Sequence, residues 1–197
     1  MKEFWNERYS KSEFVYGKEP NLFFKEELRK MTIGKVLLPA EGEGRNAVYA
    51  SANGWDVYAF DTSEEGKKKA MSLASEMKVE IVYDLMDIAD FNSEDRFDCI
   101  ALIFAHFPKQ MQQVFFEKIK TLLKVGGKLV VEGYSVEQMK NGTGGPQNDK
   151  VMYVLKDLES AFVDFDIEIA ENKTLNLSEG IFHQGKSDVI RFVAKKK

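Results

Sequence analysis

The sequence predicts an α/β fold built on a mainly parallel sheet, and three observations lead to this prediction. Short apolar runs alternate with helical patterns of roughly 10–15 residues, which is typical of βαβ units. A glycine-rich turn joins the first apolar run to a helical pattern. The last two apolar runs lie too close together for a helical crossover, which favours an antiparallel C-terminal hairpin at the sheet edge.

The individual elements follow from continuous apolar runs for buried strands and from apolar residues at helical spacing. The expected strands cover residues 36–38, 55–60, 79–83, 97–104, 128–132, 165–177 and 188–194. The expected helices cover residues 22–31, 45–53, 63–78, 109–124 and 151–162, and Ser63 can cap the third of them. Residues 135–150 are rich in Gly, Asn and Gln, which predicts either a lid or a disordered connection.

Length and composition indicate one globular domain over residues 1–197, with 44% hydrophobic and 30% charged residues. A net charge of −4 gives no indication of a nucleic-acid partner, and no apolar run is long enough to span a membrane. The N-terminus has no signal-peptide pattern, so we expect a cytoplasmic location. The one cysteine, Cys99, lies in an apolar run, which favours a buried core thiol and no metal site.

The turn Gly42-Glu43-Gly44-Arg45-Asn46-Ala47 predicts an adenosine cofactor. Gly42 can adopt the tight turn, Gly44 lets a ligand approach the backbone, and Ala47 lets the helix pack near the strand. Asp61 follows 19 residues after Gly42, at the end of the second strand, where a carboxylate would meet a ribose diol.

The charge of this turn favours one adenosine cofactor over another. A dinucleotide places its pyrophosphate on the turn and the helix N-terminus, where Glu41 and Glu43 would repel it. Both are compatible with S-adenosylmethionine (SAM), which carries a sulfonium and an ammonium. Two alternatives stay open: the glutamates point to solvent, or Arg45 neutralises one of them.

Further candidates come from the ends of later strands. Asp84, after the third expected strand, could accept a hydrogen bond from an adenine amino group, or it is an ordinary loop acid. The two histidines of the chain, His106 after the fourth strand and His183 in the last hairpin loop, are candidate catalytic bases or structural hydrogen-bonding residues. Glu132 and Tyr134 end the fifth strand and could also face a substrate.

The chain resembles a small class I SAM-dependent methyltransferase, most closely the short tellurite-resistance and thiopurine methyltransferase-like group. The stretches that carry the resemblance cover nearly the full length. They are Trp5-Asn6-Glu7-Arg8-Tyr9, Tyr16-Gly17-Lys18-Glu19-Pro20-Asn21, the strand and turn 37–47, Asp61-Thr62-Ser63, Ile103-Phe104-Ala105-His106-Phe107-Pro108, Leu123-Lys124-Val125-Gly126-Gly127, Glu179-Gly180 and His183-Gln184-Gly185.

The resemblance implies a doubly wound, seven-stranded sheet with helices on both faces and SAM over the carboxyl ends of the strands. It implies that residues 1–31 cover the cofactor cleft. The residues implied to contact SAM are Ala40, Gly42 and Gly44 at its amino-acid part, Asp61 with Thr62 at the ribose, Asp84 and Leu85 at the adenine, Phe104 beside it and Tyr16 over it. Leu38 and Ala40 replace the usual acid and glycine of the first turn, and Glu41 is a candidate for the lost charge.

These observations predict an enzyme that transfers a methyl group from SAM to a small molecule, with a soft sulfur, selenium or tellurium nucleophile as one candidate acceptor. An NAD-type oxidoreductase and a non-catalytic SAM-binding module stay open as alternatives. The sequence does not identify the methyl acceptor or the oligomeric state.

Overall fold

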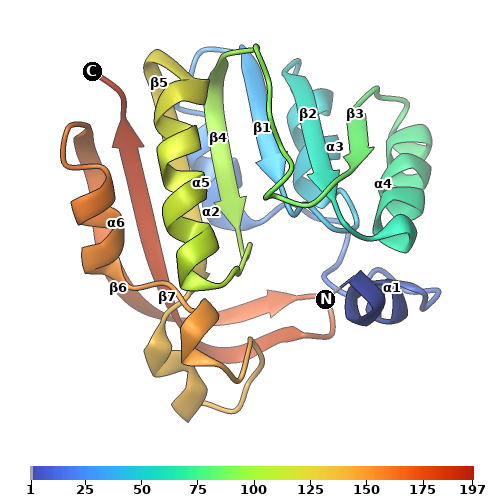
Figure 1. Cartoon of the computed structure of the whole chain (residues 1–197). Helices are drawn as coiled ribbons and strands as arrows, with labels where there is room; N and C mark the ends of the chain where they lie inside the picture. Colours follow the sequence, from blue (N-terminus) through green and yellow to red (C-terminus); the bar gives the residue numbers. More distant parts are fainter. Residues whose placement is uncertain (1) are drawn as a thin grey trace.

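The computed structural model describes residues 2–197, which form a seven-stranded sheet in the order β3-β2-β1-β4-β5-β7-β6. Strands β1 to β5 pair in parallel, whereas β7 is antiparallel to both of its neighbours (Figure 1). The strands are β1 (Lys35–Pro39), β2 (Asp56–Asp61), β3 (Val82–Leu85), β4 (Phe97–Ile103), β5 (Leu123–Tyr134), β6 (Asp166–Glu179) and β7 (His183–Lys195). The predicted fold class, with its antiparallel hairpin, is confirmed.

Helices cover both faces of the sheet, because each presents an apolar stripe to it. Helices α5 and α6 pack on one face, and α2, α3 and α4 pack on the other. Their bounds are α1 (Lys2–Tyr9), α2 (Leu22–Leu28), α3 (Arg45–Ala52), α4 (Glu64–Met77), α5 (Lys109–Leu122) and α6 (Leu155–Ala161). Ser63 caps α4 as predicted, since its hydroxyl accepts the Gly66 amide at 3.0 Å.

The central strands β1 and β4 are buried on both sides. Leu37 and Ile100 contribute to the core beneath α5, whereas Val36 and Ala101 contribute to the core beneath α3 and α4. Because β1 to β4 are parallel, their carboxyl ends meet at one edge of the sheet, where α1 also lies (Figure 1).

Most predicted elements have somewhat different bounds in the structure, and two of these differences bear on the cavity. The third strand, expected at 79–83, is β3 (Val82–Leu85), because pairing with β2 begins only where Val82 faces Tyr58. The helix expected at 151–162 is the shorter α6, since the Val151 carbonyl instead accepts hydrogen bonds from Gln112 and His106.

The stretch 135–150 forms two short 3₁₀ helices, η1 (Val136–Lys140) and η2 (Asp149–Val151), joined by a glycine-rich turn. Gln138 holds this stretch together. Its side-chain amide donates to Thr143 Oγ1 and the Gly144 carbonyl, and its side-chain oxygen accepts the Asp188 amide at 2.8 Å. The stretch is therefore an ordered loop, and the prediction of a disordered connection is wrong.

The C-terminal hairpin is tighter than expected. Its strands pair from Asp166 opposite Lys195 to Glu179 opposite His183, which leaves residues 180–182 as the whole connection. The expected long connection at 178–187 is therefore wrong. His183 is the first residue of β7, packed among aromatic rings, and does not lie in a polar loop.

Two kinds of feature are absent from residues 2–197. They contain no helix that is long and apolar enough to cross a membrane. Within the same range, no group of His, Cys, Asp and Glu side chains is arranged to hold a metal ion. Cys99 is fully buried, as predicted, and burial raises the pKa of its thiol.

Candidate active site

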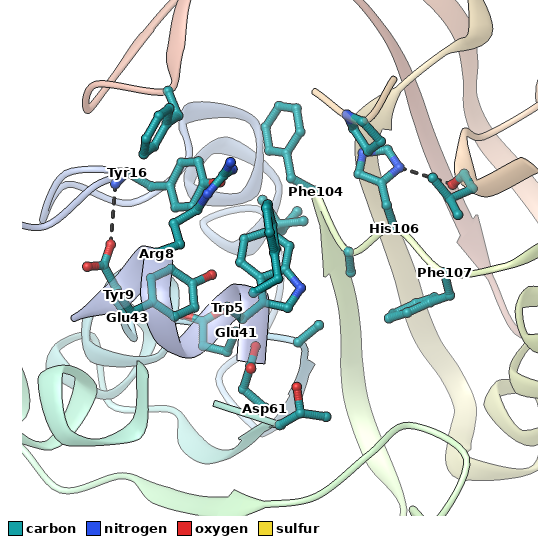
Figure 2. A pocket seen from close by; sticks show the side chains of 18 of the residues that line it. Trp5, Arg8, Tyr9, Tyr16, Glu41, Glu43, Asp61, Phe104, His106 and Phe107 are labelled. Atoms are coloured by element: carbon teal, nitrogen blue, oxygen red, sulfur yellow. Dashed lines mark hydrogen bonds between the residues drawn. The ribbon is translucent and has the colours of Figure 1, made fainter. Parts of the chain in front are cut away.

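A cavity of about 770 Å³ opens at the carboxyl ends of the strands, under α1 (Figure 2). We call the end lined by the residues that follow β1 to β3 the acidic half; it contains Ala40, Glu41, Phe60, Asp61, Thr62, Met86, Asp87 and Ile88. The other end is the aromatic half; it contains Arg8, Tyr16, Phe104, Tyr134, Phe182 and His183. Trp5 and Tyr9 of α1 also line the cavity.

Glu41 closes the N-terminus of α3. Its Oε1 atom accepts the backbone amides of Asn46 and Ala47, both at 2.8 Å. These orphan amides are the ones that would hold a pyrophosphate in a dinucleotide-binding turn. Because the chain's own carboxylate already occupies them, the turn is unsuited to NAD.

Asp61 is the last residue of β2 and lines the cavity. Its Oδ2 atom accepts the Gly42 amide at 3.0 Å, and its Oδ1 atom accepts the Ser63 amide at 2.9 Å. Burial raises the pKa of Asp61, and burial raises the pKa of Glu41 to about 7. The acidic half therefore gains from a bound cation, which would replace the lost hydration of both carboxylates. A sulfonium and an ammonium fit this requirement.

The glycines of the turn serve the fold more than the ligand. A Cβ atom on Gly44 would lie 2.5 Å from Ala70 Cβ in α4, and a Cβ atom on Gly42 would lie 2.5 Å from the Tyr9 hydroxyl. Neither glycine lines the cavity. The close approach predicted for a ligand at Gly44 is thus an approach between α3 and α4.

The adenine-facing residues expected at Asp84 and Leu85 do not line the cavity. Asp84 lies inside β3 and accepts a hydrogen bond from the Tyr58 hydroxyl, and Leu85 is 46% exposed. Met86, Asp87 and Ile88 line the cavity in their place, because β3 ends later than predicted. Ala40, Glu41, Asp61, Thr62, Phe104 and Tyr16 line it as expected.

Glu43 and Arg45 are buried and hold the N-terminal segment in place. Glu43 pairs with Lys69 at 2.8 Å and accepts the Tyr16 amide at 3.3 Å. Arg45 donates to the Tyr16 carbonyl at 3.1 Å and pairs with Glu179 at 2.8 Å. The glutamates therefore do not point to solvent, and Arg45 pairs with neither of them.

Helix α1 is fixed over the acidic half by polar contacts. Asn6 Oδ1 accepts hydrogen bonds from the Ser63 hydroxyl at 2.8 Å and the Glu65 amide at 3.4 Å. Trp5 stacks on Tyr9 with a centroid separation of 5.4 Å, and the Tyr9 ring meets Tyr16 edge-on at 6.3 Å. Aromatic side chains from the N-terminal segment thus cover the cavity (Figure 2).

His106 uses both ring nitrogens within the protein. Its Nε2 atom accepts the Tyr134 amide at 3.2 Å, so Nδ1 carries the proton and donates to the Val151 carbonyl at 3.2 Å. Burial lowers the pKa of His106 to about 4. A neutral imidazole with no free nitrogen is a structural link between β5 and the loop at Val151.

His183 has the opposite arrangement. Its ring lies 4.2 Å from Phe104 and 4.5 Å from Tyr16, measured between centroids, and its Nδ1 atom lies 3.5 Å from Glu179 Oε2. Burial raises the pKa of Glu179, but the hydrogen bond from His183 and the charge of Arg45 outweigh it and hold that pKa at about 2. An ionised carboxylate only accepts hydrogen bonds, so Nδ1 carries the proton.

The second nitrogen of His183 is free to act on a ligand. Burial lowers the pKa of His183, which keeps the ring neutral at pH 7. With the proton on Nδ1, the lone pair is on Nε2, and no hydrogen bond from the described residues reaches that atom. This carboxylate–histidine pair is the arrangement that orients a general base.

A buried polar network supports this pair from behind. The Asn21 amide donates to Glu179 at 3.1 Å and to Glu132 at 2.6 Å. Glu132 also accepts a hydrogen bond from Arg191 and does not line the cavity. Glu132 therefore serves the network and does not face a substrate.

Two unusual features mark the aromatic half. Phe104 has a φ of +52°, which costs energy in a non-glycine residue and is common at functional sites. The Tyr134 hydroxyl is the one buried side-chain polar atom within residues 2–197 that has no hydrogen-bond partner. This hydroxyl is enclosed by the protein near Gly144, although other atoms of Tyr134 line the cavity.

Comparisons with known proteins agree with this geometry. Residues 36–127, which contain β1 to β4 and the Glu41 turn, match the model of a family described as a methyltransferase domain. Residues 36–127 are therefore similar in sequence to a methyltransferase domain. A search of the curated proteins finds no match.

Solved structures share the fold of this methyltransferase over its whole length. TehB from Haemophilus influenzae matches 100% of the chain and 67% of its own, with a TM-score of 0.75 and 17% identity. A second structure is described under the conversion of a disulfide bond into a thioacetal group during echinomycin biosynthesis. It matches 100% of this chain and 93% of its own, with a TM-score of 0.79 and 16% identity. The magnesium protoporphyrin IX methyltransferase ChlM from Synechocystis PCC 6803, with bound SAH, matches 100% of this chain and 98% of its own. The TM-score is 0.71 and the identity is 13%.

Several residues of the site had no strong signal in the sequence of the methyltransferase. Arg8, Asp87, Phe182 and the loop residues 144–148 reach the cavity through the docking of α1, the end of β3 and the fold of the η1–η2 loop. Glu179 lies four residues before His183. Their spacing indicates a contact only when both residues are assigned to the two strands of one tight hairpin.

Proposed function

We propose that this methyltransferase acts on a small molecule, with a soft sulfur, selenium or tellurium atom as the methyl acceptor. The observation that carries the proposal is the oriented His183–Glu179 pair inside an aromatic wall. Polarisable rings suit a soft nucleophile, and they exclude the water that would compete with it. One similar structure is described under the conversion of a disulfide into a thioacetal, which is chemistry at sulfur.

We propose that the acidic half holds SAM and the aromatic half holds the acceptor. Asp61 would bind the ribose hydroxyls, Glu41 would attract the ammonium, and Asp87 would lie at the adenine. SAM, when bound, supplies an activated methyl group on a sulfonium. The fit rests on buried carboxylates that require a cation and on a helix N-terminus that is closed to phosphate.

In this proposal the chain positions the acceptor and moves one proton. His183 Nε2 takes the proton from a thiol, selenol or comparable acid, and Glu179 stabilises the imidazolium that forms. An acceptor that is already ionised needs only the positioning. The N-terminal segment, through Trp5, Tyr9 and Tyr16, covers the cleft during transfer.

Two measurements test the proposal. Calorimetric titration with SAM, S-adenosylhomocysteine and NAD should detect binding of the first two and none of NAD. A methyl-transfer screen with radiolabelled SAM over thiols, selenite, tellurite, thiopurines and amines should give product with the soft nucleophiles. Transfer confined to amines would overturn the acceptor class, and SAM binding without transfer to any acceptor would overturn the catalytic role.

A further inference from the structure

Arg8 is a cation at the cavity wall whose partners are all uncharged. Its guanidinium lies 4.4 Å from the Phe182 centroid and 4.5 Å from the Phe4 centroid, and it donates to the Tyr16 hydroxyl at 3.0 Å. Aromatic faces stabilise a cation but leave most of its N–H donors unused.

The other cations that line the cavity are neutralised by carboxylates. Lys2 pairs with Glu64 at 2.8 Å, and Arg45 pairs with Glu179 at 2.8 Å. No carboxylate of residues 2–197 lies within ion-pair distance of Arg8. The aromatic half therefore carries one positive charge that the protein itself does not balance.

We propose that Arg8 recognises a negative charge on the methyl acceptor, apart from the atom that receives the methyl group. The inference rests on the proposed function, because it places the acceptor in the aromatic half. The Tyr16 side chain contacts both residues, because its hydroxyl accepts a hydrogen bond from Arg8 at 3.0 Å and its ring lies 4.5 Å from that of His183, between centroids. An acceptor that contacts both Arg8 and His183 would carry its nucleophilic atom and its anionic group at opposite ends, separated by a group about as large as an aromatic ring.

Tyr134 lines the same half of the cavity. Its ring lies 5.5 Å from His183 and 4.8 Å from Phe104, between centroids. Burial raises the pKa of Tyr134, so the hydroxyl stays protonated and can donate. The unused N–H donors of Arg8 therefore complement an anion and do not complement an ammonium.

The experiment uses two thiols that differ only in charge, 4-mercaptobenzoate and 4-mercaptobenzamide. Each is titrated calorimetrically into the full chain saturated with S-adenosylhomocysteine. We expect the benzoate to bind about tenfold or more tightly, since a charge-assisted hydrogen bond contributes roughly that much. Arg8→Gln should abolish the preference, and Arg8→Lys should keep part of it.

Lys11 supplies a matched control. Its Nζ atom also lies over the Phe182 ring, at 5.3 Å, but Lys11 does not line the cavity. Lys11→Gln should retain the preference for the benzoate. Equal affinity for the two thiols, binding of neither, or a preference that survives in Arg8→Gln would overturn the role of Arg8.

The methyl-transfer rates with the same thiols separate this inference from the proposed function. Transfer to both thiols without a charge preference contradicts the role of Arg8 and leaves the proposed function intact. A binding preference that depends on Arg8, without transfer to either thiol, supports Arg8 and contradicts methylation at sulfur.

Discussion

The two halves of the cavity differ in charge and in the partners of their polar groups. In the acidic half, Glu41 and Asp61 accept backbone amides, so the groups that a ligand meets are fixed by the turn itself. In the aromatic half, Arg8, Tyr134 and His183 keep unused donors or lone pairs. In one half the protein satisfies the polar groups itself, and in the other it leaves polar groups unused. This difference is expected between a cofactor site and a substrate site.

The strongest way to break this division is His183→Ala. With an acceptor that must lose a proton, we expect the turnover rate to fall by about 10²- to 10⁴-fold, because a positioned base is lost. The affinity for SAM should not change. The turnover rate at saturating SAM and acceptor measures the first effect. Calorimetric titration with SAM measures the second.

His106→Asn is the matched control for that prediction. It removes the bonds to Tyr134 and Val151, so we expect a lower melting temperature but a far smaller loss of turnover in the folded protein. Equal losses of turnover in the two variants would refute the assignment of the base to His183.

Asp61→Asn tests the acidic half directly. The amide nitrogen of asparagine cannot accept a backbone amide hydrogen bond, and the negative charge is lost. We expect SAM to bind about 10- to 100-fold more weakly. Asp84→Asn, outside the cavity, should leave the affinity unchanged, and a loss there would return Asp84 to the adenine site.

Glu41 predicts the pH dependence of SAM binding. Its pKa in the folded protein is raised to about 7, so the carboxyl is protonated below that pH and gains its charge above it. The ionised form attracts a cationic ligand, so affinity should rise as pH increases from 6 to 8, by up to about tenfold. Titrations of the wild type and Glu41→Gln over this range separate the effect of Glu41 from that of the SAM amine. An identical pH dependence in both proteins would exclude Glu41.

Gly44→Ala should have the smallest effect on function. Its Cβ atom would meet Ala70 at 2.5 Å, and its φ of +85° disfavours any side chain, so we expect a loss of stability of about 1–3 kcal/mol without a change in SAM affinity. Gly126→Ala has a similar φ of +80° with nothing within 4 Å, and should cost about 1 kcal/mol. Chemical denaturation measures both variants. Equal costs would mean that the contact between α3 and α4 does not require this glycine.

The acidic half could largely be predicted from sequence, because its geometry is local. One turn connects β1 to α3, and β2 follows α3 directly and ends at Asp61. Residue spacing alone therefore brings Asp61 to Gly42. The expected place of Asp84 at the cavity differs from the structure for a similarly local reason. The end of a short strand is uncertain by a few residues, and β3 ends at Leu85, which moves the cavity-facing position to Asp87.

The aromatic half could be predicted only in part, because its contacts join distant segments. The pairing of Glu179 with His183 depends on the register of β6 with β7, and the contact of Arg8 with Phe182 depends on how α1 docks. Hydrophobic periodicity fixes neither register nor docking. His106 and His183 were equivalent candidates in the sequence, and only their hydrogen-bond partners distinguish them.

The chain order of the two halves has a practical consequence for engineering. Every residue of the acidic half lies between positions 36 and 127, whereas the residues of the aromatic half, except Phe104, lie before or after that span: Arg8, Tyr16, Tyr134, Phe182 and His183. An exchange of the two ends with those of another methyltransferase would keep the proposed SAM-binding residues, provided that the new ends rebuild the core around β5, β6 and β7. Chimeras joined near positions 36 and 127 would inherit their substrate preference from the grafted ends.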